Sequence, residues 1–228
     1  MKISIIVPAL NEADEITAVL AGLAPLRNRG HEVIVVDGGS SDKTPDLARG
    51  TADRVASAPR GRASQMNAGA ALAQGEVLVF LHADTRLPED ADARILQGLA
   101  ESGRAWGRFD VRIEGASPWL PVIAFFMNLR SRATGIATGD QAIFVRREAF
   151  ERAGCFPSLE LMEDIALSRS LRRLSRPLCL ADKAVASGRR WERRGVLRTV
   201  LLMWRLRLAF FFGAAPAELA RLYDGERR

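Results

Sequence analysis

Residues 76–88 read EVLVFLHADTRLP, and this stretch decides the fold. An apolar run of strand length ends in His82 and Asp84, and Pro88 then stops it. The preceding residues 64–75, SQMNAGAALAQG, have the alanine content of a helix and end in glycine. A helix followed by a buried strand that ends in a carboxylate is typical of an α/β protein with a ligand site beyond its strand ends.

The same alternation runs through the first hundred residues. Residues 3–9, ISIIVPA, predict a strand, and residues 11–26 continue with an asparagine cap and apolar positions at helical spacing. Residues 31–37, HEVIVVD, predict the next strand, and a shorter strand is expected at residues 53–59. The expected fold is therefore α/β, with a mostly parallel central sheet flanked by helices.

The regular alternation weakens after about residue 105. Strands are predicted in AWGRFDVRI and GDQAIFVRR, and an amphipathic helix is predicted in LMEDIALSRSLRRL. We expect one domain with two halves and a C-terminal amphipathic helical appendage. The expected boundaries are 1–190 for the domain, 1–100 and 101–190 for its halves, and 191–228 for the appendage.

Composition and charge limit the function classes. Of the 228 residues, 48% are hydrophobic and 26% are charged, which is typical of a soluble globular domain. Cys155 and Cys179 lie far apart without metal-ligand spacing, so neither a disulfide framework nor a zinc site is predicted. The net charge of +6 suggests an anionic partner. No RNA-binding strand motif or helix-turn-helix pattern accompanies this charge, so nucleic acid is not an expected partner.

Two stretches bear on membrane association. Residues 196–215, VLRTVLLMWRLRLAFFFGAA, are strongly apolar, but the arginines within them argue against a membrane-spanning helix. At about 100° per residue, Arg194, Arg198 and Arg205 share one narrow face. This pattern fits a helix in the membrane surface or a helix packed on the core. The N-terminal MKISIIVPALNE lacks a signal-peptide pattern, so we expect a cytoplasmic protein, either free or peripheral on the cytoplasmic face of the membrane.

The turns after the first two predicted strands separate several kinds of nucleotide site. The first turn, PALNEAD, lacks a glycine-rich dinucleotide motif, and the chain has no P-loop lysine motif. The second strand runs into VVDGGSSDKT, where Asp37 can accept hydrogen bonds from a base or a ribose. Residues 40–42 are interpreted more simply as caps of the following helix.

The segment APRGRASQMNAGA predicts an anion site. Arg60 and Arg62 provide permanently charged, fork-shaped donors suited to a diphosphate, and the start of a helix adds its positive end. Gln65 and Asn67 follow on the same helix. A basic surface loop is the alternative interpretation.

The end of the fourth predicted strand suggests a metal site. His82 and Asp84 can place a nitrogen and an oxygen near one divalent ion. Such an ion can bridge the two phosphates of a nucleotide diphosphate and stabilise the charge of a leaving group. For His82, the alternative of a buried histidine held by the backbone stays open.

These motifs together resemble those of family 2 glycosyltransferases with the GT-A fold. The resemblance lies in IIVPALNEADEI, VIVVDGGSSDKT, GRASQMNAGAALAQGEVLVFLHADTRLP and MEDIALSRSLRR, and it covers nearly the whole chain. The HAD triplet is similar to that of a small bacterial subfamily associated with radical-SAM proteins, some members of which are labelled diaponeurosporenoate glycosyltransferases. The motifs specify the family better than the acceptor.

The resemblance implies a nucleotide-sugar site in the first half and Mn²⁺ or Mg²⁺ as a cofactor. Asp84 takes the place of the last aspartate of the DxD motif, which holds the metal. His82 stands where the first acid would be, so the resemblance implies Asp84 as the main protein ligand and no second carboxylate from this motif. Asp37 matches the base-recognising aspartate. The residues implied in nucleotide-sugar binding are Pro8, Ala9, Asn11, Glu12, Asp37, Arg60, Gln65, Asn67 and Ala83.

The second half supplies the implied catalytic residues. Asp164 in MEDI resembles the aspartate that takes the proton from the acceptor hydroxyl, which implies inversion at the anomeric carbon. Glu163 is its neighbour, although acids at a helix start are also explained by the helix dipole alone. SGRRW resembles a Q-x-x-R-W motif, but Ser187 replaces the glutamine, so processive polymer synthesis is not expected. The residues expected to close over the acceptor or the diphosphate are Gly139, Asp140, Gln141, Arg190 and Trp191.

The expected function is a metal-dependent, inverting glycosyltransferase that uses a nucleotide-diphosphate sugar, by default a UDP-sugar, and a small or lipid-like acceptor. PWLPVIAFFMNL and the C-terminal segment would suit a lipid or carotenoid-like molecule. One alternative is a sugar nucleotidyltransferase, which usually opens with a glycine-rich loop that PALNEAD lacks. The other is a non-catalytic module that binds a nucleotide sugar or a membrane. The sequence does not identify the sugar, the base or the acceptor.

Overall fold

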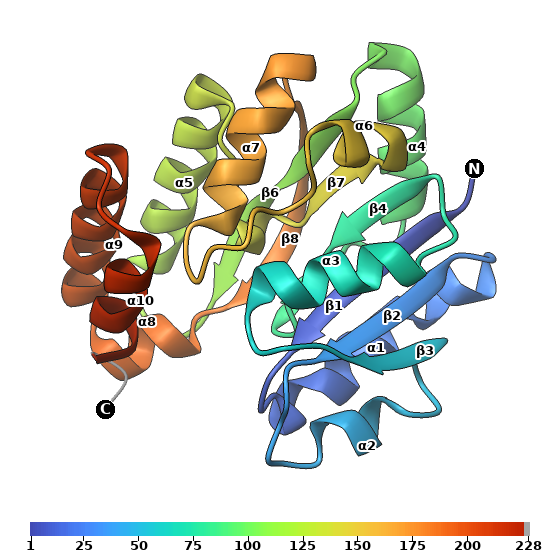
Figure 1. Ribbon diagram of the computed structural model, residues 1–228, viewed down its shortest axis with the longest axis horizontal. Coiled ribbons are helices and arrows are strands. Elements are labelled where there is room, and N and C mark those ends of the chain that lie inside the picture. The colour runs from blue at the N-terminus through green and yellow to red at the C-terminus, as the bar shows by residue number, and fades with distance from the viewer. Residues whose placement is uncertain (226–228) are drawn as a thin grey trace.

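The computed structural model describes residues 1–225 and contains a mixed β-sheet with helices on both faces (Figure 1). The strands follow one another across the sheet in the order β3-β2-β1-β4-β7-β6-β8-β5. Their bounds are β1 (Ile3–Ala9), β2 (Glu32–Asp37), β3 (Arg54–Ser57), β4 (Val77–Phe80), β5 (Thr85–Arg86), β6 (Trp106–Glu114), β7 (Ile143–Arg146) and β8 (Leu178–Ser187).

The first half of the chain forms a parallel part of the sheet. β1 lies between β2 and β4 and pairs with both in parallel, and β3 continues the parallel series beside β2. Every residue of β1 and β2 is buried, as expected for strands covered on both faces. The carboxyl ends of these strands meet at one edge, where Ala9 of β1 lies opposite Asp37 of β2. The α/β sheet predicted for this half is confirmed.

The second half adds strands in both directions. β7 pairs antiparallel with β4 and β6, and so joins the two halves of the sheet. β8 pairs in parallel with β6, and the short β5 pairs antiparallel with the end of β8. The sequence did not predict β8 or β5. β8 is largely half-exposed, Asp182 and Lys183 interrupt its apolar residues, and β5 is only two residues long.

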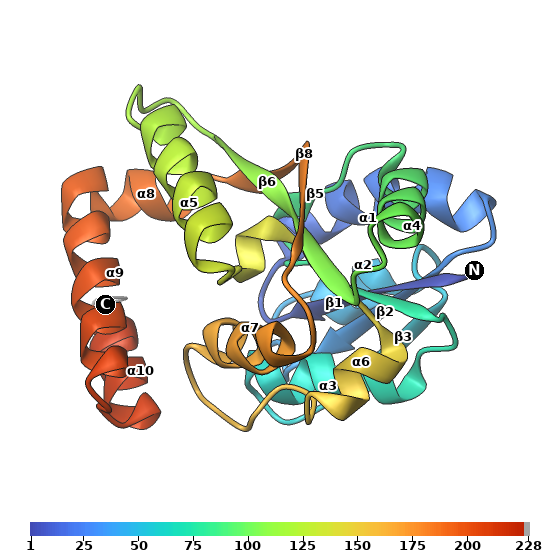
Figure 2. The same cartoon turned by 90° about the horizontal axis from the view of Figure 1, so that it is seen from above.

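The helices form two layers that enclose the sheet (Figure 2). One layer contains α1, α4 and α5, and the other contains α3, α6 and α7. The helix bounds are α1 (Ala13–Asn28), α2 (Thr44–Ala48), α3 (Arg62–Leu72), α4 (Ala91–Ser102), α5 (Leu120–Thr134), α6 (Arg147–Arg152), α7 (Glu163–Leu174), α8 (Arg189–Arg194), α9 (Val196–Phe211) and α10 (Pro216–Gly225), with a 3₁₀ turn η1 at Gly139–Gln141.

Alternating side chains of the central strand β1 pack against the two helix layers. Ile5 of β1 lies in the core beneath α1 and α4, whereas Ile6 lies in the core beneath α3, α6 and α7. Gly69 lets α3 approach this second face closely, because a Cβ atom there would lie 2.4 Å from Cγ2 of Ile6. The close approach holds the start of α3 near the carboxyl edge of the sheet.

The C-terminal segment consists of α8, α9 and α10 and lies beside α5 and α7 (Figure 2). Leu202 and Leu206 of α9 form a small core with Met162 and Ile165 at the start of α7. The prediction that Arg194, Arg198 and Arg205 form one stripe on a single helix is wrong. Gly195 (φ 80°) separates two helices, and Arg194 belongs to α8 whereas the other two arginines belong to α9. Within residues 1–225, no helix has both the length and the hydrophobicity needed to cross a bilayer.

Candidate active site

The turn after β1 is tied to the turn after β2. Asn11 adopts a left-handed backbone conformation (φ 55°), and its side-chain oxygen accepts a hydrogen bond from the backbone N–H of Ser41 at 2.8 Å. It is not the predicted helix cap, because α1 begins after Glu12. The Glu12 N–H donates to Oγ1 of Thr44 at 2.8 Å, and the Glu12 carboxylate pairs with Arg189 of α8 at 3.1 Å. Sequence reasoning named Arg190, whose side chain lies outside the described residues, and missed Arg189.

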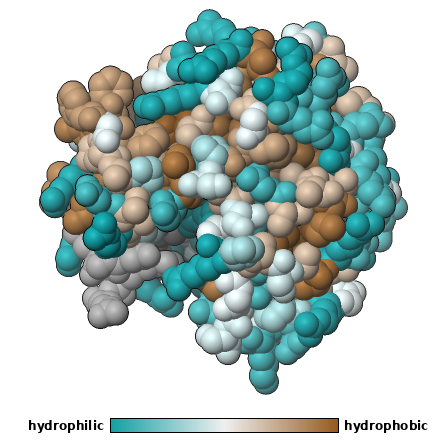
Figure 3. Space-filling model, viewed as in Figure 1, coloured by the Kyte–Doolittle hydropathy of each residue, from teal (hydrophilic) through white to brown (hydrophobic). Residues whose placement is uncertain are grey.

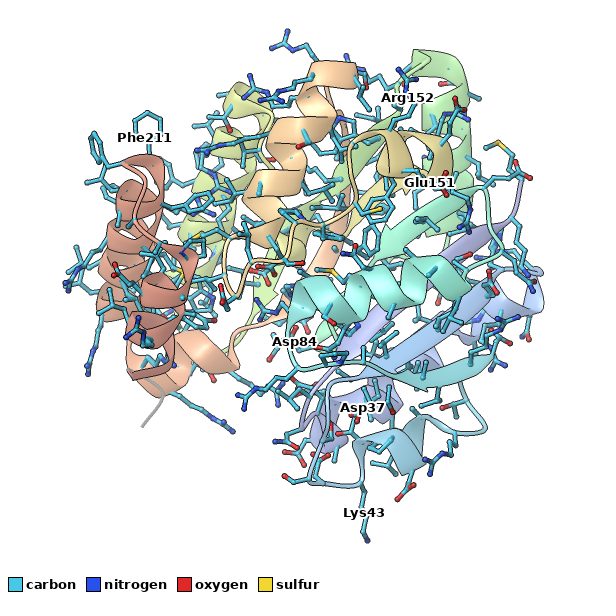
Figure 4. All side chains as sticks on the ribbon, in the orientation of Figure 1. Asp37, Lys43, Asp84, Glu151, Arg152 and Phe211 are labelled. Carbon is cyan, nitrogen blue, oxygen red and sulfur yellow. The ribbon has the colours of Figure 1, made fainter. Side chains whose placement is uncertain are left out.

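Asp37 ends β2 at the same edge of the sheet as Asp84 (Figure 4). It is buried, and its Oδ2 accepts hydrogen bonds from the backbone N–H groups of Gly39 and Ser40 at 2.9 and 3.1 Å. These bonds shape the glycine turn, and the weaker 3.3 Å contact from Ser40 to Oδ1 leaves that oxygen better able to accept from a ligand.

Two polar side chains of α3 hold the backbone of neighbouring elements. Gln65 is buried, and its Nε2 donates to the carbonyl oxygens of Ala9 and Val36, both at 2.8 Å. Asn67 exchanges two hydrogen bonds with the backbone of Phe156. Both amide groups thus stabilise the fold through hydrogen bonds to the backbone. Of the other residues predicted for nucleotide-sugar binding, Arg60 lies exposed in a loop, whereas Pro8, Ala9 and Ala83 are buried.

Asp84 lies in a loop that other strands hold in place. Its backbone oxygen accepts a hydrogen bond from the N–H of Ser187, the last residue of β8, at 3.1 Å. Burial raises the pKa of Glu12, and the charge of Asp84 adds to that increase, which places the two carboxylates within electrostatic reach of each other. Within residues 1–225, no group of three or more histidine, cysteine or acidic residues has the geometry of a metal site.

His82 faces the second half of the chain. Its Nδ1 lies 3.3 Å from Oδ1 of Asp140. Its Nε2 lies against Gly139, where an added Cβ atom would be only 2.1 Å away. Both ring nitrogens are therefore close to η1, and position 139 has no room for a side chain.

Asp164 lies in the first turn of α7, beside η1. Its Oδ2 accepts a hydrogen bond from the Gly139 N–H at 3.0 Å, and its Oδ1 accepts one from the Ile165 N–H at 2.7 Å. Burial raises the pKa of Asp164, although these two hydrogen bonds and the nearby His82 oppose the increase. Met162, just before the helix, has a left-handed backbone conformation (φ 69°) that is uncommon for a bulky residue and marks a strained turn at this site.

Glu163 and Arg62 lie beside Asp164. Glu163 is only 4% exposed, and its Oε1 lies 4.0 Å from Nη1 of Arg62. Burial and the adjacent charge of Asp164 raise the pKa of Glu163. Burial alone would lower the pKa of Arg62. The negative charges of Glu163 and the other nearby acids have a larger effect and raise this pKa. The site therefore combines acids that hold protons more tightly than usual with a firmly cationic arginine.

Arg62, Asp84 and Asp164 line a common cavity of about 1160 Å³. It brings together eight of the site residues predicted from the sequence, whereas Asp37 and Arg60 do not line it. Sequence reasoning missed Arg130 of α5, which also lines the cavity, because a single arginine in an apolar helix has no motif around it. Gln141, predicted near the acceptor, is fully buried and bonds with Thr138 and Asn128. The predicted site residues that line the cavity are Arg62, His82, Asp84, Gly139, Asp140, Glu163, Asp164 and Trp191.

An α/β sheet with acidic residues above the ends of its strands is the arrangement of GT-A glycosyltransferases. Residues 4–154 match Glycosyl transferase family 2, and the chain belongs to this family. The mannosyltransferase PcManGT from Pyrobaculum calidifontis, solved with GDP-Man and Mn²⁺, aligns with a TM-score of 0.66 at 21% identity, over 98% of this chain and 70% of that chain. This likeness confirms the predicted fold class. The narrower resemblance to the HAD subfamily stays a prediction.

Two curated relatives match parts of the chain. A PGL/p-HBAD biosynthesis glycosyltransferase from Mycobacterium bovis is 37% identical over 106 residues, which are 43% of this chain and 41% of that protein. An undecaprenyl-phosphate 4-deoxy-4-formamido-L-arabinose transferase from Serratia proteamaculans is 27% identical over 158 residues, which are 64% of this chain and 48% of that protein. The chain thus spans less than half the length of these relatives.

Proposed function

We propose that this chain is a metal-dependent, inverting glycosyltransferase that moves a sugar from a nucleotide-diphosphate sugar to a small or lipid-like acceptor. The observation that carries the proposal is the shared cavity: Asp84 of the sheet edge and Asp164 of α7 both line it. A carboxylate suited to a metal-bound diphosphate and a carboxylate suited to a general base thereby face the same space. Family membership supports the same chemistry.

Asp164 is the proposed general base. The backbone N–H groups of Gly139 and Ile165 hold its carboxylate in place, and its raised pKa makes it a better proton acceptor than an exposed aspartate. The acceptor oxygen forms a bond to the anomeric carbon as the bond from that carbon to the diphosphate breaks, and the proton goes to Asp164. Attack from the side opposite the diphosphate inverts the anomeric centre. Arg62 carries positive charge toward the departing diphosphate.

Asp84 is the proposed protein ligand of Mn²⁺ or Mg²⁺, with Glu12 nearby. Magnesium is commonly bound by one or two protein carboxylates together with substrate phosphates and water. Asp84 with Glu12 nearby matches this kind of coordination. A bound ion would neutralise charge on the diphosphate. His82 is less suited to ligation, because its ring nitrogens lie against Asp140 and Gly139.

The acceptor is proposed to lie between α5 and α9. Both helices contribute apolar side chains to the cavity, including Val122, Phe126, Met203 and Leu206. Such a lining suits an apolar chain, of the lipid or carotenoid-like kind. The name of the Serratia relative specifies a lipid phosphate acceptor for that protein, which supports a lipid-like acceptor here.

Binding and turnover across a panel of nucleotide sugars test this function. UDP-, GDP- and dTDP-sugars are titrated by calorimetry with and without Mn²⁺, and released nucleoside diphosphate is measured in parallel. We expect one nucleotide class to bind with metal and to release its diphosphate slowly as the sugar is transferred to water. If the chain instead makes nucleotide sugars and pyrophosphate from nucleoside triphosphates and sugar phosphates, it is a nucleotidyltransferase. Binding without any turnover would indicate a non-catalytic module, and no binding at all would contradict the proposal.

We also propose that the C-terminal segment contacts an anionic membrane surface. Leu197, Leu201, Trp204, Leu208 and Phe211 of α9 are all more than half exposed. Apolar residues gather at the upper left of Figure 3, and Figure 4 shows Phe211 pointing outward from the end of α9. Arginines interleave with these residues along α9, as expected for a helix at an anionic surface. An exposed apolar face of this kind commonly marks an interaction site.

Leu201→Glu is expected to lower partition onto phosphatidylglycerol vesicles about tenfold, because burial of a leucine contributes roughly 1.5–3 kcal/mol. Leu201 is 58% exposed and does not line the cavity. Leu47→Glu, on α2, serves as a control, because Leu47 is also exposed but lies far from α9 (Figure 1). Cosedimentation measures the partition. Equal partition of the Leu201→Glu variant and the wild type would contradict membrane contact through α9.

A further inference from the structure

We propose that Arg130 binds an acidic group of the acceptor, either a phosphate or a carboxylate. The acceptor would then combine an apolar chain with a negatively charged head. This inference rests on the proposed glycosyltransferase function and names the chemical class of the molecule that receives the sugar.

The evidence is an arginine in the wall of the cavity with two buried nitrogen atoms that have no hydrogen-bond partner among the described residues. Arg130 lines the cavity from α5, and its Nε and Nη2 atoms are buried without a hydrogen-bond partner among the residues that the structure describes. Burial lowers the pKa of Arg130. A buried cation with unsatisfied donors is costly for folding, so its presence calls for an anion from outside the protein.

The two unpartnered donors have the geometry of a fork. Nε and Nη2 lie on one edge of the planar guanidinium group, and this edge can donate two parallel hydrogen bonds to two oxygens of one acid. Carboxylates and phosphates both offer such an oxygen pair. Hydroxyl or amide groups do not offer two equivalent anionic oxygens, so the fork favours acids.

The position of Arg130 assigns the acid to the acceptor. Phe126 and Met127 lie about one turn before Arg130 on α5, and they line the same cavity. An acid held by Arg130 would therefore continue into an apolar chain against these side chains. The charge of Asp164 acts on the pKa of Arg130, which places the guanidinium near the proposed base. The acid bound by Arg130 would thus lie close to the place where a separate hydroxyl of the acceptor gives its proton to Asp164.

A second arginine on the same helix provides a matched control. Arg132 has ordinary partners, since it pairs with Asp110 at 2.8 Å and bonds the backbone oxygen of Cys179. Arg130→Met removes two buried, unsatisfied hydrogen-bond donors and is expected to leave the melting temperature unchanged or to raise it. Arg132→Met breaks an ion pair and is expected to leave ligand preference unchanged.

Decyl phosphate, decanoate and decanol test the inference by calorimetry, because they share one chain and differ in the head group. We expect the wild type to bind at least one of the two acids about tenfold or more tightly than decanol. Arg130→Met should lose this preference, Arg130→Lys should keep part of it, and Arg132→Met should keep all of it. The acid that binds better identifies the head group as a phosphate or a carboxylate.

Equal binding of decanol and both acids by the wild type would overturn the inference, and so would an Arg130→Met variant that retains the preference. Nucleotide-sugar binding is measured on the same samples. If nucleotide sugars bind but acids are not preferred, the inference about Arg130 fails while the proposed function stands. If acids are preferred but no nucleotide sugar binds, the anion site stands and the proposed glycosyltransferase function fails.

Discussion

Asp164→Asn is expected to lower the rate of sugar transfer by about 10²–10⁴-fold, the usual contribution of a general base. Asparagine has nearly the same shape as aspartate but cannot take a proton from the acceptor oxygen. Donor binding should change little, because the proposed metal ligand is Asp84. The measurements are single-turnover transfer rates and donor affinities for the wild type and the variant, with Asp14→Asn on the exposed surface of α1 as a control. A variant that retains more than a tenth of the wild-type rate would remove Asp164 from the role of base.

The pH dependence of the transfer rate and of stability, compared between the wild type and Asp164→Asn, provides a second test of the role of Asp164. Because burial raises the pKa of Asp164, the wild-type rate should fall as the pH drops through a value above the usual range for aspartate. The ionised, buried carboxylate destabilises the folded state above that pKa, and protonation removes the cost below it. Asparagine can accept only one of the two backbone hydrogen bonds, a loss that does not depend on pH. The stability of Asp164→Asn relative to the wild type should therefore be highest at neutral pH and should decline as the pH falls. Denaturant unfolding at several pH values measures it.

Asp84→Asn is expected to abolish the metal-dependent part of donor binding. Loss of one charged partner from such a contact costs roughly 2–5 kcal/mol, which is about 30-fold or more in the dissociation constant. The weaker, metal-independent binding of the nucleotide should remain, because Asp37 and the glycine turn are untouched. Calorimetric titrations with and without Mn²⁺ separate the two contributions. If Mn²⁺ strengthens binding equally in the wild type and in Asp84→Asn, the metal is held elsewhere.

His82→Asn tests whether His82 binds the metal or only positions η1. The imidazole of His82 faces Asp140 and Gly139, so we expect this variant to retain the effect of Mn²⁺ on donor affinity. Its transfer rate should fall, because the contact that positions η1 and the Gly139 N–H beside Asp164 is lost. A variant that loses the metal effect as fully as Asp84→Asn would make His82 a ligand.

The sequence predicted the first half of the fold well because its signals there are local. β1, β2 and β4 are short apolar runs, and each is followed by a polar turn. Parallel strands place their carboxyl ends at one edge, so the approach of Asp84 to Glu12 follows from topology. The convergence of Asp164 on the same cavity does not follow from local patterns. It was expected only through the resemblance to a family, and the roles of these residues stay predictions.

Sequence position does not show which way a polar side chain faces. Gln65 and Asn67 lie in a motif that resembles a nucleotide site, yet their amide groups bond the backbone of β1, β2 and Phe156. Arg130 shows the reverse case, because nothing in its local sequence distinguishes it from Arg132. Within the part of the chain that the structure describes, the packing of α5 leaves two nitrogens of Arg130 without a hydrogen-bond partner, whereas Arg132 has an ion pair.

The contact between Gly139 and His82 constrains how this chain can change. The imidazole fills the space that a methyl group at position 139 would need, and the Gly139 N–H is the one that donates to Asp164. A substitution at position 139 therefore displaces the histidine, the turn or the carboxylate, and its effect depends on the residue at position 82. We therefore expect the two positions to be energetically coupled: with histidine at position 82, glycine is required at position 139, and a smaller residue at position 82 should relax that requirement.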